Sequence, residues 1–173
     1  MKTLLIIIAG VIALGVFLSE ANEEQLIIPT ESLRLRIVPN SNRQEDIEVK
    51  SLLKKLLGNN LEESLKNSQT LEESKNIIRN DLENIESIVS EALRPLNMAY
   101  QINLGQNYFP AKNFKGITYQ AGMYESLVVT IEKGEGDNWW CVLFPPLCSL
   151  KRDTELEEVE YQFFVSRIIN KFR

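Results

Sequence analysis

An unbroken apolar run near the N-terminus decides which part of this chain is available to fold into a domain. The run covers the fifteen residues from Leu4 to Leu18 and follows the basic Lys2. As a helix it would be about 22 Å long, short of the roughly 30 Å hydrocarbon core of a bilayer. Small residues occupy the positions expected before a cut between Ala21 and Asn22. We therefore predict that residues 1–21 are a signal peptide or an uncleaved signal anchor, and that the remainder lies outside the cytosol.

The part of the chain after this segment has the length of one domain. Cleavage at the predicted point would leave 152 of the 173 residues. That length is enough to bury one core but short for two. We assign residues 22–32 to a linker and residues 33–173 to a single exported domain.

Composition excludes several classes of function. The formal net charge is −5 and no basic block stands out in the exported part, which argues against a nucleic-acid partner. The chain has no histidine, so catalytic triads that use a histidine base are excluded. Two cysteines supply too few ligands for a structural zinc site. We expect no metal and no cofactor, and contact with a membrane only through the N-terminal segment if that segment is uncleaved.

Alternating apolar and basic residues predict that the exported domain begins with a strand. Every second residue from Leu33 to Ile37 is apolar, and Arg34 and Arg36 stand between them. This period of two places the arginines on the face opposite the apolar side chains. We interpret the two arginines as a weak candidate patch for a partner on an outer face; the alternative is ordinary solvated charge.

Two capping patterns predict two helices after this strand. Ser41 with Gln44 opens a helix that we expect to run to about Leu57, before a break at Gly58–Asn60. Its expected buried stripe comprises Val49, Leu52, Leu53, Leu56 and Leu57.

Thr70 with Glu73 opens the second and longest helical pattern, which runs to about Leu93 before Pro95. Apolar residues at spacings of three and four predict one continuous face for it, formed by Ile78, Leu82, Ile85, Val89 and Ala92.

The second half of the chain is dominated by strand patterns. Ala99–Leu104 and Leu127–Ile131 are rich in β-branched and aromatic residues, and Tyr108–Tyr119 carries hairpin punctuation. From Thr154 onward, spaced apolar residues predict a closing helix. The order strand, helices, strands, helix predicts an α+β domain in which a helical layer packs on a small, mainly antiparallel sheet.

One late segment combines both tryptophans, both cysteines and two of the six prolines. It follows a turn-rich stretch, we expect it to form a loop, and it comprises Asn138, Trp139, Trp140, Cys141, Val142, Leu143, Phe144, Pro145, Pro146, Leu147 and Cys148. Two cysteines in an exported chain most simply form a disulfide, here Cys141–Cys148, and a redox role is disfavoured because their spacing is unlike that of thiol-exchange motifs. The segment either fills the core of its own domain or presents a rigid aromatic surface to a partner.

Three segments resemble the stage II sporulation protein R family. They are Leu33–Asn42, Tyr119–Val129 and Asn138–Cys148, and the likeness spans about residues 33 to 148. The last segment is long and rare in composition, so it is the most specific of the three. One departure is Gln120, which stands where this family commonly has proline.

The resemblance implies a signalling protein rather than an enzyme. Members of this family are made in the forespore and cross into the space between the two septal membranes. There they activate a membrane-embedded aspartic protease, which then processes the precursor of the mother-cell sigma factor. We accordingly expect this protease as the partner and the Asn138–Cys148 segment as its contact surface or the support of that surface.

Two alternatives from other classes remain. One is an exported enzyme, either thiol-dependent or a hydrolase that uses paired carboxylates such as Glu125 and Glu132, although nothing in their spacing singles them out. The other is a structural module of the septal envelope.

Overall fold

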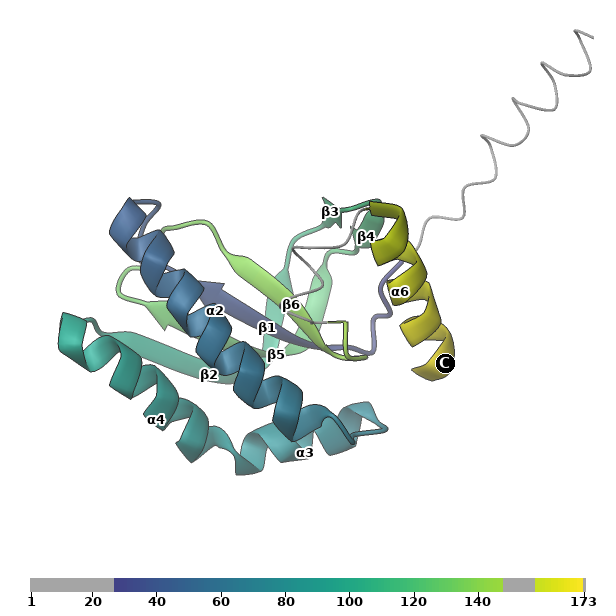
Figure 1. Cartoon of the computed structure of the whole chain (residues 1–173), viewed down its shortest axis with the longest axis horizontal. Coiled ribbons are helices and arrows are strands. Elements are labelled where there is room, and N and C mark those ends of the chain that lie inside the picture. The colour runs from purple at the N-terminus through teal and green to yellow at the C-terminus, as the bar shows by residue number, and fades with distance from the viewer. Residues whose placement is uncertain (1–26, 148–157, 173) are drawn as a thin grey trace, which may run out of the picture.

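The computed structural model describes residues 27–147 and 158–172 (Figure 1). The predicted signal segment 1–21, Cys148 and the expected start of the closing helix at Thr154 lie outside the described residues. In chain order the described elements are β1 (Leu33–Val38), α2 (Gln44–Leu65), α3 (Leu71–Asn80), α4 (Leu82–Leu93), the short 3-10 helix η1 (Arg94–Leu96), β2 (Tyr100–Phe109), β3 (Lys112–Phe114), β4 (Ile117–Tyr119), β5 (Gly122–Ile131), β6 (Trp139–Phe144) and α6 (Glu158–Phe172).

Strands β2, β5, β1 and β6 form a mixed sheet, in that order. Strand β1 lies inside the sheet, parallel to β5 and antiparallel to β6, and β2 runs antiparallel to β5. The parallel pair is possible because helices α2, α3 and α4 lie between β1 and β5 along the chain. Strands β3 and β4 form a separate antiparallel hairpin. The predicted α+β class is confirmed.

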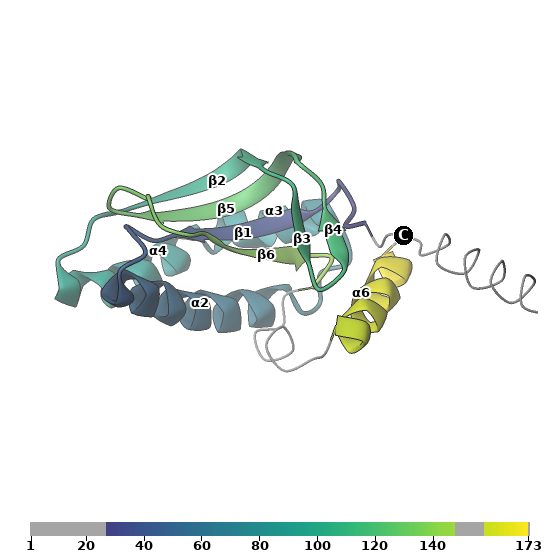
Figure 2. The same ribbon diagram turned by 90° about the horizontal axis from the view of Figure 1, so that it is seen from above.

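Helices α2, α3 and α4 cover one face of the sheet (Figure 2). Alternate residues of β1 point into this layer, and Leu33, Leu35 and Ile37 are each 0% exposed. Leu127 of β5 and Cys141 of β6, which pair with Leu35, belong to the same core. Full burial of one such aliphatic side chain contributes about 1.5–3 kcal/mol. Most of the large buried apolar side chains therefore lie between the sheet and these helices.

Helix α2 continues beyond the point where the sequence predicted its end. It passes through Gly58–Asn60 and ends at Leu65. A glycine inside a helix costs about 1 kcal/mol relative to alanine. Leu61 and Leu65 are 0% and 5% exposed, and their burial outweighs that cost. The predicted break was wrong because tertiary packing overrides the local preference of the glycine.

The buried face of α2 also differs from the predicted stripe. The residues that face the sheet follow a spacing of four, so Leu52 and Leu56 are 42% and 38% exposed. The buried members are Val49, Leu53, Leu57, Leu61 and Leu65.

The second helical pattern is divided into α3 and α4. Its predicted capping residue is confirmed, since Thr70 Oγ1 accepts a hydrogen bond from the Glu73 amide at 3.1 Å. The single continuous helix was wrong, because Asp81 leaves helical geometry at φ −96° and ψ 5° and the two helices meet at an angle (Figure 1). Asp81 accepts a side-chain hydrogen bond from Asn84 at 3.2 Å. Short polar side chains of this kind compete with helical backbone bonding.

A second, smaller core lies on the other side of the sheet. It joins α6 to the β3–β4 hairpin, to β6 and to the segment that precedes β1, through Ile28, Ile117, Val142, Leu147, Phe164, Val165 and Ile169. Ile28 is 0% exposed and its amide donates to Thr118 O at 3.2 Å. The described end of residues 22–32, which we expected to be a linker, is therefore packed into the fold. Figure 2 shows α6 beside the β3–β4 hairpin.

The late aromatic segment is a strand where we expected a loop. Residues Trp139–Phe144 form β6, which pairs with β1 along the edge of the sheet. Strands β2 and β5 are also longer than predicted, with ten residues each. Cross-strand pairing with β1 stabilises β6, and this long-range contact is absent from the local sequence pattern.

Candidate functional site

The structure brings both arginines of β1 together with aromatic side chains from three other strands. Because side chains alternate along a strand, Arg34 and Arg36 lie on the face opposite the helices. The expected outer position was wrong for Arg34, which is 2% exposed, and so was the alternative of ordinary solvated charge there, while Arg36 is half-buried. The contact of the two arginines with a partner stays a prediction. Aromatic residues of β2, β5 and β6 lie on this face beside the two arginines.

Two aromatic rings lie against the guanidinium groups, and a third packs on one of these rings. The Arg34 guanidinium lies 3.3 Å from the centroid of Tyr124 and 5.3 Å from that of Phe109, and the Arg36 guanidinium lies 5.0 Å from Phe109. The Phe109 ring also contacts Trp140 edge-on, with 5.4 Å between centroids. We call these five residues, Arg34, Arg36, Phe109, Tyr124 and Trp140, the arginine–aromatic cluster. The rings stabilise the cations through their negative faces.

Hydrogen bonds satisfy only part of this cluster. Arg34 Nε donates to Ser32 Oγ at 3.2 Å, and Arg36 Nη1 donates to the carbonyl oxygen of Tyr108 at 3.2 Å. None of the ion pairs recorded among the described residues involves either arginine. Burial lowers the pKa of both guanidinium groups from their ordinary value, since removal from water disfavours the charged form.

The two tryptophans point to opposite faces of the sheet. Trp140 pairs with Arg36 and belongs to the arginine–aromatic cluster, whereas Trp139 pairs with Ile37 and packs against the helical side. There the Lys54 ammonium lies 5.1 Å from the Trp139 ring centroid. On the cluster side, the Lys112 ammonium lies 5.2 Å from the Trp140 ring centroid. The predicted aromatic segment is thus divided between two environments.

Most of the remaining residues of the predicted segment are buried. Pro146 is exposed, as is Asn138 ahead of the strand, while Pro145 is buried. The others contribute to the two cores; these are Cys141, Val142, Leu143, Phe144 and Leu147. The predicted disulfide stays a prediction, because Cys148 lies outside the described residues. The segment therefore fills the domain's own core and exposes little apolar surface.

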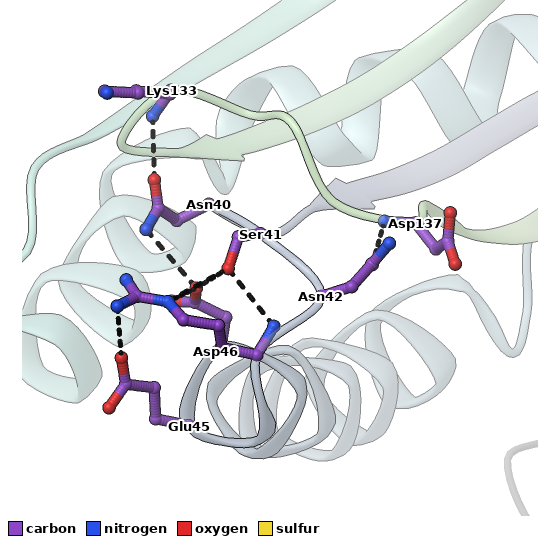
Figure 3. A network of polar contacts seen from close by, with 8 residues as sticks. Asn40, Ser41, Asn42, Glu45, Asp46, Lys133 and Asp137 are labelled. Carbon is purple, nitrogen blue, oxygen red and sulfur yellow. Dashed lines mark hydrogen bonds and ion pairs between the residues drawn. The ribbon is translucent and has the colours of Figure 1, made fainter.

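The turn after β1 joins the strand to α2 through one buried carboxylate (Figure 3). Asp46 is 1% exposed, and its Oδ2 accepts hydrogen bonds from Ser41 Oγ at 2.5 Å and from Asn40 Nδ2 at 3.3 Å. Arg43 Nε lies 3.7 Å from the same oxygen. The predicted capping box was wrong in detail: Arg43 occupies the N-cap position without a side-chain cap, and Asp46 in the first turn replaces the expected Gln44.

The same turn holds the loop between β5 and β6. The Asp137 amide donates to Asn42 Oδ1 at 2.7 Å, and the Gly136 amide donates to Pro39 O at 3.0 Å. A β-carbon on Gly136 would lie 2.4 Å from Ser41 O, so only glycine fits this close approach. These contacts fix the chain direction at the entry to β6 and give the Pro39–Asn42 sequence a structural role.

The carboxylates considered as a hydrolytic pair do not meet. Glu125 lies in β5, 3.3 Å from the Lys75 ammonium, while Glu132 follows the end of that strand and accepts the Ala99 amide at 2.6 Å. Within the described ranges no group of three or more His, Cys, Asp or Glu side chains is arranged to hold a metal ion. No helix in the same ranges combines the length and the apolar character needed to cross a bilayer.

Comparison with known proteins places these features in a family. A profile described as Stage II sporulation protein R matches residues 29–154. The chain belongs to the stage II sporulation protein R family. Stage II sporulation protein R of Bacillus subtilis (strain 168) is 32% identical over 133 residues, which cover 76% of this chain and 59% of that protein. The chain thus spans less than two thirds of that curated relative, and no solved structure matches it.

The stage II sporulation protein R match confirms the resemblance first seen in three short segments. It includes every residue of the arginine–aromatic cluster and of the turn at Asp46. Family membership assigns the protein a role in sporulation. Sequence reasoning missed Phe109 and Tyr124 as members of the cluster. The available signals were the hairpin pattern of Tyr108–Tyr119 for Phe109 and the resemblance over Tyr119–Val129 for Tyr124.

Proposed function

We propose that this chain is an extracytoplasmic signalling protein of sporulation that activates a membrane-embedded aspartic protease. In this proposal it is made in the forespore, crosses into the space between the septal membranes and binds the protease there. The activated protease then processes the precursor of the mother-cell sigma factor. The observation that carries the proposal is the family match, which covers residues 29–154 and so most of the chain beyond the predicted export segment.

Activation by binding requires a difference in affinity between two states of the protease. A ligand shifts such an equilibrium only by the ratio of its affinities for the active and inactive forms. The chemistry would belong to the aspartates of the protease, and this chain would supply binding energy alone. The chain needs a specific contact surface for that role and no catalytic group of its own.

The partly exposed side of the arginine–aromatic cluster is the surface we propose for this contact. Arg36 and Trp140 are half-buried there, and the exposed Lys112 lies against the Trp140 ring. Arginine and tryptophan are the residue types that most often dominate the binding energy of interfaces. This surface replaces the wider Asn138–Cys148 segment, most of which is buried.

Reconstitution in a non-sporulating host tests both parts of the proposal. The chain is co-expressed with the candidate protease and the sigma factor precursor, and precursor cleavage is followed by immunoblotting. We expect cleavage with the wild-type chain and none without it. Absence of cleavage in the presence of all three folded proteins would refute the activating role.

The two tryptophans supply a matched pair for the contact surface. Trp140→Ala is expected to abolish cleavage, because it removes the ring at the proposed contact. Trp139→Ala, on the helical side, is expected to retain cleavage in protein that circular dichroism shows to be folded. If both folded variants support normal cleavage, Trp140 does not contribute to the contact.

A further inference from the structure

Most of the buried polar side-chain atoms that lack a hydrogen-bond partner among the described residues lie in one place, and those are all donors. Among the described residues, five buried side-chain nitrogen or oxygen atoms have no hydrogen-bond partner. Four of them belong to the arginine–aromatic cluster: Arg34 Nη1, Arg34 Nη2, Arg36 Nε and Trp140 Nε1. All four are donors, and all are carried by side chains that contact the Phe109 ring. Four donor atoms of the cluster therefore have no acceptor among the described residues.

Burial of these unpaired donors lowers the stability of the folded state. An arginine remains charged in proteins, and burial of a charge without a counter-ion is strongly unfavourable. Contact with Tyr124 and Phe109 compensates part of the charge, but Nη1 and Nη2 of Arg34 still have no hydrogen-bond partner. No described carboxylate forms an ion pair with Arg34 or Arg36. In native proteins such atoms are paired with protein, water or a ligand.

We propose that the arginine–aromatic cluster binds a carboxylate group through the paired Nη1 and Nη2 edge of Arg34. A carboxylate is planar, accepts hydrogen bonds only, and matches the two parallel N–H groups of a guanidinium. Arg36 Nε and the Trp140 indole N–H are two further unpartnered donors in the same cluster. The carboxylate comes either from a small free acid or from an Asp or Glu side chain of a protein partner. The test of this site does not depend on the protease proposal, because carboxylate binding is measured on the isolated chain.

Titration of the purified full chain with sodium acetate tests the site. The probes are the Arg34 and Arg36 Nε–H resonances and the Trp140 indole N–H resonance in ¹⁵N-edited NMR spectra. Saturable shifts of these resonances are expected with acetate, and none with sodium chloride at the same ionic strength. Arg34→Met should abolish them, while Arg43→Met, which removes an exposed arginine, should leave them unchanged. No saturable shift in the wild type, or equal shifts in Arg34→Met, would overturn the site and indicate bound water alone.

A second variant keeps the test decisive if Arg34→Met fails to fold. Trp140→Phe preserves an aromatic ring and removes only the indole donor. The affinity for acetate should fall about tenfold, as expected for loss of one hydrogen bond to a charged group. Unchanged affinity in this variant would remove Trp140 from the site.

Two capped peptides separate the possible sources of the carboxylate. Acetyl-Gly-Glu-Gly-amide and acetyl-Gly-Gln-Gly-amide differ in a single side-chain carboxylate. Tighter binding of the Glu peptide than of acetate would identify a protein side chain as the source. Equal binding of the Glu peptide and acetate would identify a free acid. Equal binding of the Glu and Gln peptides would contradict carboxylate recognition altogether.

Discussion

Asp46 is the residue whose replacement tests the proposed anchoring of the turn between β1 and α2 most directly. Its carboxylate is 1% exposed and accepts from the side chains of Ser41 and Asn40. In Asp46→Ala both donors would lose their acceptor in a partly buried place. Asn40 also accepts the Lys133 amide through its Oδ1 at 3.4 Å, so the disturbance would reach the loop before β6.

The expected loss of stability follows from these contacts. A hydrogen bond to a charged group contributes about 1.5–3 kcal/mol, and an acidic residue in the first turn of a helix adds about 0.3–1 kcal/mol. The ion pair with Arg43 counts for little, because the Arg43 side chain is 67% exposed. We therefore expect Asp46→Ala to lower the free energy of unfolding by about 2–4 kcal/mol, a large part of the roughly 5–15 kcal/mol of a typical domain.

Urea unfolding followed by circular dichroism measures this change. The matched control is Glu45→Ala, one residue earlier, whose side chain is 65% exposed and contacts only Arg43 among the described ion pairs. Substitutions of that kind usually stay within about 0.5 kcal/mol. If Asp46→Ala and Glu45→Ala have the same free energy of unfolding within that margin, the buried carboxylate does not hold the turn.

Three further predictions concern stability. Leu57→Ala, at a side chain that is 0% exposed, should lower the free energy of unfolding in urea by about 2–5 kcal/mol. Leu56→Ala, at 38% exposure, should lower it by about 0.5 kcal/mol or less. Equal losses in the two variants would contradict the buried face of α2. Gly136→Ala should cost about 1–3 kcal/mol, because the new β-carbon would lie 2.4 Å from Ser41 O, and an unchanged midpoint would show that the turn yields freely. Hydrogen bonds to Glu72 and Glu125 raise the pKa of Lys75 above its ordinary 10.5. The wild type should therefore have a higher free energy of unfolding than Lys75→Met below pH 10.5, and this difference should disappear as the pH rises through the raised pKa. A stability difference that does not change with pH would show that the charge of Lys75 does not cause it.

Much of the helical layer was predictable because its signals are local. The Thr70 cap is contained within four consecutive residues, and the structure shows the predicted bond to the Glu73 amide. The strand at Leu33–Ile37 was predictable from its period of two. Such patterns record which side of a helix or strand faces the core and which side faces water, and residues close in the sequence are enough to show it.

The errors arose where distant segments compete with local preference. Gly58 lies within α2 because Leu61 and Leu65 reach the core beyond it. Asp46 replaces the expected capping residue because the carboxylate also bonds Asn40, whose backbone and side chain hold the loop that follows β5. Neither outcome can be derived from a window of ten residues, since contacts such as that between Asn40 and Lys133 join residues 93 positions apart.

The arginines show a second limit of the sequence pattern. Alternation in β1 predicted that Arg34 and Arg36 share a face, and the register with β5 and β6 agrees. The pattern does not say whether that face is open. It is closed over Arg34 by Phe109 and Tyr124, which come from strands that lie seventy residues or more later in the chain. A charged residue in a strand is therefore no measure of solvent exposure.

Strand β6 explains why a rare cluster of residue types can serve two purposes. Read along the chain, Trp139–Cys148 is one feature, and its composition suggests one surface. Folded as a strand, its described part sends alternate side chains to opposite sides, so Trp139 supports the helical core and Trp140 completes the arginine–aromatic cluster. A single residue step along β6 thereby separates the side chain that packs in the helical core from the one that we propose for recognition. Substitutions on the two sides of β6 should fall into two classes, and the contrast between Trp139 and Trp140 is the most direct measure of that separation.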